Sequence, residues 1–431
     1  MTFENSITHA RQLDKEDPLR RFRQEFLIPR FNGKPALYFT GNSLGLQPRR
    51  TKSIVLEELE DWGTMGVDGH FQARRPWLHY HKFTKRALAR IVGAKAAEVV
   101  AMNQLTINLH LMMATFYKPT RQRFKIMAEA GAFSSDQYAL ETQLRWHGLD
   151  PNEALIEISP RNGEATLRTE DILQAIQQHG ESLALVLFGA VQYYTGQFFD
   201  VRTITAEAHR AGAIAGFDLA HAVGNTPLNL HRDKVDFAVW CSYKYLNSGP
   251  GAIAGAFVHE RHGNNTTTPR LAGWWGHDAK ERFEMRKGFK PMPGADGWQV
   301  SNVPVLQAAA HLAALDIFEQ CGMQSLRRKS VLLTGFLEYL LNSLDPSNQY
   351  FKIITPPASR ERGCQLSIFF YEHGKKVMKA LTAKGMIVDW REPNVIRVAP
   401  VPLYNTFVEV YNFVQVLKEE LLKVSKKVKL S

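Results

Sequence analysis

Residues 235–251 read VDFAVWCSYKYLNSGPG, a stretch that joins an apolar segment, a polar turn and a Gly-Pro-Gly ending. The turn holds Lys244 among aromatic residues. A lysine packed in this way at a strand end is partly desolvated, which disfavours the ammonium form and lowers the pKa. We therefore expect Lys244 to present an amine that can form a Schiff base with an aldehyde.

An acidic residue, Asp218, ends another apolar segment in AGAIAGFDLAHAVGN at 211–225. A carboxylate directly after a buried strand must be paired or lie at a strand tip, and for a single aspartate a structural role is the common one. The joint occurrence of Asp218, His221 and Lys244 favours a cofactor instead. An acid to pair with a pyridinium nitrogen and a lysine to hold an aldehyde carbon are what pyridoxal phosphate requires.

Apolar segments alternate with amphipathic segments between about residues 80 and 300. Strands are predicted at 98–103, 123–129, 153–160, 183–191, 213–218 and 235–241, and helices at 80–94, 104–117, 134–148, 169–180 and 203–212. This alternation predicts an α/β fold whose mainly parallel sheet is covered by helices on both faces. Ligands of such sheets bind beyond the carboxyl ends of the strands.

The chain is predicted to have three parts. Residues 1–60 form an N-terminal arm with a helix, which packs with the smaller domain. Residues 61–304 form the large domain that holds the cofactor. Residues 305–431 form a smaller α+β domain, because long helices are followed there by short strands and a final helix.

Composition is that of an ordinary globular protein, with 45% hydrophobic and 22% charged residues and a formal net charge of +11. Basic residues are dispersed apart from KVSKKVKLS at 423–431, which we interpret as a solvated tail. A milder alternative is that some arginines serve anionic ligands. Since basic residues do not cluster and no segment reaches about 20 apolar residues, neither nucleic acid nor a membrane is expected as a partner.

The cysteines and histidines show no spacing typical of a metal site. The cysteines are Cys241, Cys321 and Cys364, and the histidines considered are His79, His81 and His110. Residues 1–18 lack the apolar stretch of a signal peptide. These observations predict a cytoplasmic protein without a metal.

Two predicted helices begin with residues that can bind a phosphate. Leu105 and Thr106 open the helix after strand 98–103, and a helix N-terminus with a hydroxyl group favours an anion. Alternatively, Thr106 only caps its helix. Phe133, which could stack on a flat ring, precedes Ser134-Ser135-Asp136, and capping is the commoner role of such a sequence.

Arg397 lies in the apolar strand NVIRVAPV at 394–401 and needs a partner, for which a carboxylate is best suited. The partner is either an acid of the protein or the α-carboxylate of an amino-acid substrate. Trp274 and Asn302 lie in predicted loops. An exposed tryptophan commonly packs, but its indole N–H can also donate to a phosphate.

Seven stretches together resemble kynureninase, in order and over nearly the whole chain. They are GNSLGLQP (41–48), GHFQARRPW (69–77), NQLTINLH (103–110), FDLAHAVGN (217–225), CSYKYLNSGPGAIAGAFVHERH (241–262), GWWGH (273–277) and RVAPVPLYN (397–405). The short GNSLG motif alone is weakly specific, whereas the long stretches around Asp218 and Lys244 are strongly so.

The resemblance implies a fold-type-I pyridoxal phosphate enzyme of the aspartate aminotransferase superfamily that acts as a homodimer. It implies hydrolysis of L-kynurenine, or of 3-hydroxy-L-kynurenine, to the corresponding anthranilate and L-alanine. Such an activity belongs to tryptophan catabolism and NAD biosynthesis. The sequence leaves the choice between the two substrates open.

The resemblance also implies the residues of the site. Lys244 would hold the cofactor, Asp218 would pair with its ring nitrogen, and Tyr243 would act as an acid or base. The cofactor-binding residues would be Leu105, Thr106, Phe133, Ser134, Ser135, Asp136, Asp218, His221, Tyr243, Lys244, Trp274 and Asn302. Phe133 would stack on the ring, and Tyr243 and Trp274 would hold the phosphate. The substrate-binding residues would be Arg397 at the carboxylate and Ser43, His70 and Asn302 at the aryl end.

Two positions depart from the family's usual pattern. Ser134 stands where the family typically has a proline. Gly189-Ala190 offers no hydroxyl group, whereas the family usually has Ser or Thr at or next to position 189. One hydrogen bond near the cofactor is therefore expected to be missing or supplied by water.

Two other functions remain open from the sequence. An aminotransferase or a cysteine desulfurase would share the lysine and the aspartate. A desulfurase also needs a reactive cysteine on a mobile loop, and Cys364 lies in an apolar, strand-like segment. A non-catalytic basic binding protein would have clustered basic residues, salt-sensitive affinity for nucleic acid and no visible absorption.

Overall fold

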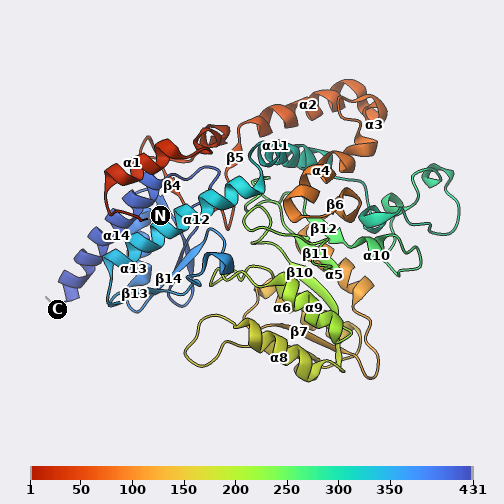
Figure 1. Ribbon diagram of the computed structural model, residues 1–431. Coiled ribbons are helices and arrows are strands. Elements are labelled where there is room, and N and C mark those ends of the chain that lie inside the picture. The colour runs from red at the N-terminus through yellow and green to blue at the C-terminus, as the bar shows by residue number, and fades with distance from the viewer. Residues whose placement is uncertain (1, 429–431) are drawn as a thin grey trace.

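The protein has two layered parts that lie side by side, one around a seven-stranded sheet and one around a four-stranded sheet (Figure 1). The structure, a computed structural model, describes residues 2–428, without the side chains of residues 424–428. Of the predicted solvated tail at 423–431, the backbone is described as helical up to Val428, and the side chains after Lys423 lie outside the described residues. Among these residues, no helix is long and apolar enough to cross a membrane.

The large sheet confirms the predicted α/β fold. Its strands, in spatial order, are β6 (Val99–Ala101), β12 (Gly255–Val258), β11 (Phe237–Trp240), β10 (Ile214–Asp218), β9 (Leu183–Gly189), β7 (Lys125–Glu129) and β8 (Leu155–Ile158). Neighbours from β11 to β8 are parallel, whereas β12 is antiparallel to both of its neighbours. Since β6 again runs in the direction of β11, six strands end at the same edge of the sheet.

Both faces of this sheet are buried, as the continuous apolar strands indicate. On β9, Val186 and Phe188 belong to the core on one face, and Leu185 and Leu187 belong to the core on the other. Helices α4 (Tyr80–Val92), α8 (Thr169–His179), α9 (Val201–Arg210) and α11 (Val305–Cys321) cover the first face. Helices α5 (Leu105–Phe116) and α6 (Ser134–Trp146) cover the second.

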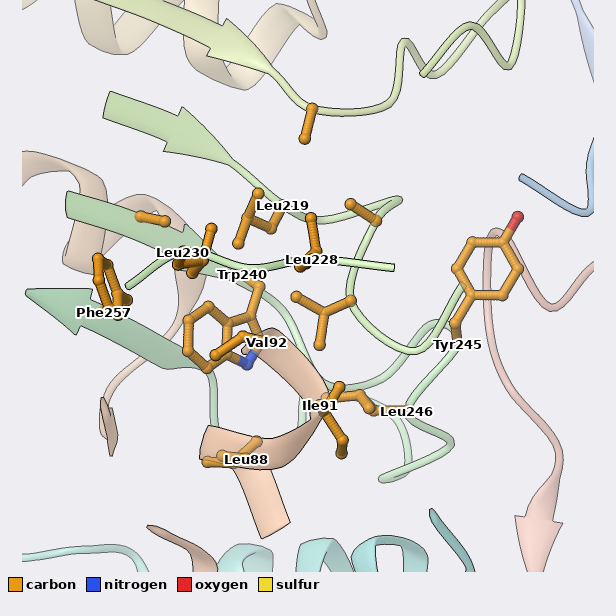
Figure 2. Close-up of a cluster of buried hydrophobic side chains, with 14 of the residues drawn as sticks. Leu88, Ile91, Val92, Leu219, Leu228, Leu230, Trp240, Tyr245, Leu246 and Phe257 are labelled. Carbon is orange, nitrogen blue, oxygen red and sulfur yellow. The ribbon is translucent and has the colours of Figure 1, made fainter. Parts of the chain in front are cut away.

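The first core anchors the turn that holds Lys244 (Figure 2). Trp240 at the end of β11 and Leu246 after the turn belong to one buried cluster with residues of α4. Tyr245 is buried in the same cluster. Since side chains on both sides of Lys244 are fixed by packing, the backbone position of the lysine is fixed as well.

The second part is built on an antiparallel sheet with the order β13-β14-β17-β16. Its strands are β13 (Phe351–Ile353), β14 (Leu366–Phe370), β17 (Val395–Val398) and β16 (Asp389–Arg391). Helices α12 (Met323–Leu344), α13 (Gly374–Thr382), α14 (Phe407–Val428) and α1 (Ile7–Glu16) share its core. Figure 1 shows α1 from the start of the chain beside α14 from its end.

Short strands fasten the N-terminal arm to the rest of the molecule. Strands β1 (Phe26–Leu27) and β5 (Gln47–Pro48) pair with each other, as do β2 (Arg30–Phe31) and β3 (Lys34–Pro35). Strand β4 (Leu37–Tyr38) pairs with β15 (Met386–Ile387), and Thr40 bridges to Ala399. The arm thus contacts the C-terminal part of the chain, while the division at 60 and 304 stays a prediction.

The remaining helices are α2 (Arg50–Met65), α3 (Gly69–Gln72), α7 (Pro151–Ala154) and α10 (Glu260–Gly263). Helix α2 packs on α11. Between α10 and α11, the described chain forms short 3₁₀ turns and an isolated bridge between His277 and Pro291. This segment extends outward near α10 (Figure 1).

Candidate functional site at the carboxyl ends of the strands

A cavity lies at the carboxyl ends of the parallel strands, where sheets of this type bind ligands. It encloses about 550 Å³ of empty space, part of it open to solvent. Strands β7, β9 and β10 contribute their last residues, Glu129, Gly189 and Asp218. The other lining residues are Leu105, Thr106, Phe133, Ser135, Asp136, Val191, Tyr193, Ala220, His221, Tyr243 and Lys244. The structure therefore brings most of the predicted cofactor-binding residues together.

Lys244 reaches this cavity from the turn after β11. Its Nζ lies 3.0 Å from Nε2 of His221. The same atom lies 5.8 Å from the ring centroids of Phe133 and of Tyr243. The amine is thus placed between aromatic rings and an imidazole, at the edge of the sheet that also carries Asp218.

The turn of Lys244 packs tightly against the GNSLG stretch of the N-terminal arm. The N–H of Gly45 donates to the carbonyl oxygen of Tyr243 over 2.8 Å. A Cβ atom on Gly45 would lie 2.3 Å from the carbonyl oxygen of Lys244. Only glycine fits this close approach of two backbones.

Three buried carboxyl groups share the cavity with Lys244. Asp218 accepts a hydrogen bond from the N–H of Ala220 over 2.6 Å. Burial raises the pKa of Asp218, but the Lys244 charge and the Ala220 N–H oppose this rise. Burial, and then repulsion from Asp218, raises the pKa of Asp136 well above its ordinary value, and burial raises that of Glu129 to about 8. Of the three groups, Asp218 is therefore the one whose contacts most favour the ionised form.

His221 and Asp136 carry buried polar atoms that lack partners. Burial, and then the charge of Lys244, lowers the pKa of His221 well below its ordinary value, so the imidazole is neutral. Nδ1 of His221 and Oδ1 of Asp136 have no hydrogen-bond partner among the described residues. Buried polar atoms without partners are rare in native proteins. Since both residues line the cavity, the site fits a polar, planar group such as pyridoxal phosphate.

Thr106 and Ser135 lie near the converging N-termini of α5 and α6, with their hydroxyl oxygens 2.8 Å apart. Neither caps its helix, because the N-caps are Gln104 and Phe133 and make no side-chain cap bond. The capping explanation is therefore wrong for both residues, since α5 already begins at Leu105 and α6 at Ser134. The hydroxyl groups and the unpaired N–H groups of the first turns are available to an anion.

Arg397 is buried next to the cavity, with 1% of its surface exposed. It pairs with Asp389 on the neighbouring strand β16 and donates to the carbonyl oxygen of Tyr193 over 2.7 Å. A protein acid is thus its partner in this structure. Its Nε is buried without a partner among the described residues. Since Tyr193 lines the cavity, the guanidinium lies directly behind the cavity wall.

Besides Arg397, five predicted site residues do not line the cavity within one copy of the chain: Ser43, His70, Ser134, Trp274 and Asn302. Ser43, Ser134 and Asn302 are exposed. The ring of His70 lies 5.4 Å from that of Trp77. Trp274 exposes 46% of its surface, and its indole N–H donates to the Arg282 carbonyl over 3.2 Å. These residues can serve the cavity of this chain only if a second copy or a movement brings them there.

Three lining residues were missed from the sequence: Glu129, Val191 and Ala220. Glu129 carried a usable signal, because it ends the predicted strand 123–129 just as Asp218 ends 213–218. Val191 and Ala220 carry no polar group that would mark them. The structure also places the ring of Tyr193 against that of Phe133, at a centroid distance of 5.3 Å.

One group of described residues, Glu98, His231 and His259, has spacing that could hold a metal ion. None of them lines the cavity. Nδ1 of His259 already accepts the N–H of Arg261, and the Glu98 carboxylate accepts two backbone N–H groups. The two imidazole rings stack at 12°, so their lone pairs do not converge on one ion between them. The group therefore has the contacts of a structural cluster.

Comparisons with known proteins identify relatives of this chain. A family model described as the kynureninase C-terminal domain matches residues 326–417. A kynureninase from Myxococcus xanthus is 54% identical over 417 residues, which cover 96% of this chain and 97% of that protein.

Solved structures with a similar fold include a cysteine desulfurase from Thermococcus onnurineus, with a TM-score of 0.74, 18% identity and coverage of 95% and 97%. A mutant of the enzyme C-DES with glycine linked to its PLP cofactor has a TM-score of 0.73, 15% identity and coverage of 89% and 96%. Such low identities show the fold alone. Identity above one half over nearly the full length is a different kind of evidence, and it shows that this chain belongs to the kynureninase family.

Proposed function

We propose that this chain holds pyridoxal phosphate on Lys244 and hydrolyses L-kynurenine, or 3-hydroxy-L-kynurenine, to an anthranilate and L-alanine. Membership in the kynureninase family supports this activity. One observation carries the proposal at the level of the site. The Lys244 amine, the Asp218 carboxyl group and the unpartnered Nδ1 of His221 belong to one cavity at the carboxyl edge of the sheet.

The cavity offers the contacts that this cofactor requires. When bound, pyridoxal phosphate supplies an aldehyde carbon and an electron-accepting ring. Lys244 would hold the carbon, Asp218 would pair with the ring nitrogen, and Phe133 would cover the ring. Tyr243 and the first turns of α5 and α6 would bind the phosphate, with Thr106 and Ser135 as hydroxyl donors.

Proton transfer falls to two neighbouring residues. The Lys244 amine would take the α-proton of the substrate, and neutral His221 at 3.0 Å would orient its Nζ. Burial raises the pKa of Tyr243, so its phenol keeps its proton and can donate it to the carbon that becomes the methyl group of alanine. A water molecule attacks the γ-carbonyl carbon of the substrate, and the bond between the β- and γ-carbons breaks. The hydroxyl part of the water stays in the carboxyl group of the anthranilate, and the β-carbon gains a proton to become the methyl group.

Recognition of the substrate rests on residues around the rim. Arg397 binds the α-carboxylate, exchanging part of its contact with Asp389. Ser43, His70 and Asn302, brought to the cavity by a second copy or by a movement, surround the aryl ring and offer polar partners to a ring hydroxyl group. Competition between the two substrates, measured as kcat/KM, decides which one the enzyme prefers.

A homodimer completes the site in this proposal. Apolar side chains are exposed along the segment between α10 and α11: Leu271, Trp274, Phe283, Met285 and Phe289. Exposed apolar patches of this kind mark interfaces. We infer that Trp274 and Asn302 serve the cavity of the neighbouring copy.

The three buried, unpaired cysteines support a reducing, cytoplasmic compartment.

The activity is tested by incubating the cofactor-loaded protein with each substrate and following anthranilate fluorescence. No product from loaded protein would refute the proposal. Lys244→Ala should lose the visible absorption of the bound cofactor, and a borohydride-reducible lysine linkage in that variant would show the anchor to be elsewhere. Sulfide release from cysteine tests the desulfurase alternative, which buried cysteines disfavour.

A further inference from the structure

Glu129 lines the cavity but has no part in the chemistry above. It ends β7, and Gly189 and Asp218 end the next two strands of the sheet, β9 and β10. Gly189 and Asp218 are partners in register. Because neighbouring strands lie about 4.8 Å apart, Glu129 and Asp218 are separated only by a strand end that carries no side chain.

The carboxyl group of Glu129 occupies the space beside Gly189. A Cβ atom on Gly189 would lie 3.0 Å from Oε1 of Glu129, which is closer than an ordinary contact. The backbone N–H of Gly189 interacts with the same carboxyl group. Only 4% of Glu129 is exposed. Its side chain is thus held over the end of β9, where a residue with a side chain would meet it.

The cavity has one cation for its three carboxyl groups. Asp136 from α6 and Asp218 from β10 face Glu129, and Lys244 supplies the positive charge among the lining residues, since His221 is neutral. A buried carboxylate without a positively charged partner is costly. Burial raises the pKa of Glu129 to about 8, with repulsion from Asp218 in the same direction.

We propose that Glu129 is a positioning residue that works as a neutral acid, filling the space over Gly189 and leaving Asp218 as the only carboxylate at this strand edge. This inference rests on the proposed role of Asp218 as partner of the ring nitrogen. A charged Glu129 would repel the Asp218 carboxylate and compete with it for the proton of the ring nitrogen. A neutral Glu129 holds the backbone of β9 without this competition.

Glutamine has the shape of the neutral acid and does not titrate, so Glu129→Gln isolates the charge. The folded parent keeps the proton of Glu129 up to about pH 8, whereas an ordinary glutamate loses it near pH 4.5. Between these values the native state binds more protons than the unfolded chain, and the stability of the parent falls as pH rises. We therefore expect the Tm of the cofactor-free variant to rise relative to that of the cofactor-free parent as pH increases across this window. Above about pH 8 the difference should level off.

Glu157→Gln is the matched control, because Glu157 is exposed on the adjacent strand β8. Its Tm difference from the parent should stay flat over the same pH range. A flat difference for Glu129→Gln would overturn the proposal, since the residue would then be ionised in the folded protein. This readout needs no substrate and remains valid if the proposed activity fails.

Activity provides the second readout, through rescue by the conservative variant. Glu129→Ala leaves a void beside Gly189 and an unpaired N–H, so we expect kcat/KM at pH 7 to fall by more than about tenfold. Glu129→Gln should restore most of this loss. Equal losses in both variants would show that a carboxylate is needed and would contradict the proposal, whereas absence of activity in the parent would refute only the proposed function.

Discussion

At the scale of single residues, the partners of each carboxyl group in the cavity decide which one is charged. Asp218 has the Lys244 ammonium group and the Ala220 N–H to oppose the effect of burial. Glu129 has mainly burial, relieved by one backbone N–H. One chemical type of side chain can therefore provide both a counterion and a neutral spacer within one cavity.

Asp218→Asn tests the counterion. An amide cannot keep the ring nitrogen of the cofactor protonated, and a hydrogen bond to a charged group contributes up to about 3 kcal/mol, so kcat should fall by about two orders of magnitude. KM should change less, because the substrate does not contact this residue. Steady-state kinetics and the visible spectrum of the bound cofactor measure both effects.

The matched control for this substitution is Asp200→Asn. Asp200 is exposed and caps α9 by accepting the N–H of Thr203, a role that asparagine fills equally well. The control should keep the kinetics of the parent. Unchanged kcat in Asp218→Asn would remove Asp218 from the proposed mechanism.

At the scale of elements, the turn after β11 depends on a glycine nearly 200 positions earlier in the chain. In Gly45→Ala, the new methyl group would lie 2.3 Å from the Lys244 carbonyl oxygen and 2.7 Å from Cα of Asn247. Backbone atoms cannot yield cheaply, so we expect the Lys244 turn to shift and the protein to lose cofactor during gel filtration. The ratio of visible to ultraviolet absorption measures this loss.

Gly63→Ala is the control, because a Cβ atom at Gly63 on α2 meets nothing within 4 Å. Alanine in a helix is favoured over glycine by about 0.5–1 kcal/mol, so this variant should be slightly more stable and retain its cofactor. Full cofactor retention by Gly45→Ala would show that the turn does not need the arm.

A second element-scale contact joins α9, β10 and α10 through Asp236. Its carboxylate accepts the N–H of Ala215 and contacts His209, His262 and Arg261. Burial opposes ionisation, but these partners together hold the pKa of Asp236 below its ordinary value.

The stabilisation by Asp236 is therefore present above the ordinary aspartate range and is lost as pH falls through the lower pKa of the folded state. At neutral pH we expect Asp236→Asn to lower the free energy of unfolding by roughly 1–3 kcal/mol. The deficit should shrink progressively below about pH 4. Chemical denaturation at several pH values measures the trend, and a deficit that is constant with pH would contradict it.

At the scale of the whole molecule, a homodimer predicts that two defective variants repair each other. In a hybrid dimer of Lys244→Ala and Trp274→Ala, the cavity of the Trp274→Ala copy keeps its lysine. The Lys244→Ala copy supplies the intact tryptophan to that cavity. Random reassociation gives half hybrids with one working site each, so about a quarter of the parent activity should return. Mixing Lys244→Ala with Asp218→Asn should restore nothing, since both residues line the same cavity. No recovery in the first mixture, with both variants dimeric, would place Trp274 in the site of its own chain.

The sequence predicted the sheet and the central pair Lys244 and Asp218, because apolar periodicity and polar residues at strand ends are local signals. It missed β12, which is short and directly follows a glycine-rich turn. The position of Arg397 was predicted, but its partner Asp389 was not, since that pairing depends on the register of β16 against β17. The capping prediction was wrong at Thr106 and Ser135 because each helix begins two residues earlier than capping by these residues requires.

The pairing of β4 with β15 has a consequence for folding during synthesis. Residues 37–45 leave the ribosome long before residues 386–399, yet they find their strand partner and the Ala399 bridge only there. Strand β4 therefore stays without its strand partner until the C-terminal part of the chain has been made. A nascent chain arrested before residue 386 is expected to carry a folded large sheet with β4 unpaired, so the arm is held against the Lys244 turn only through contacts such as that of Gly45 with Tyr243.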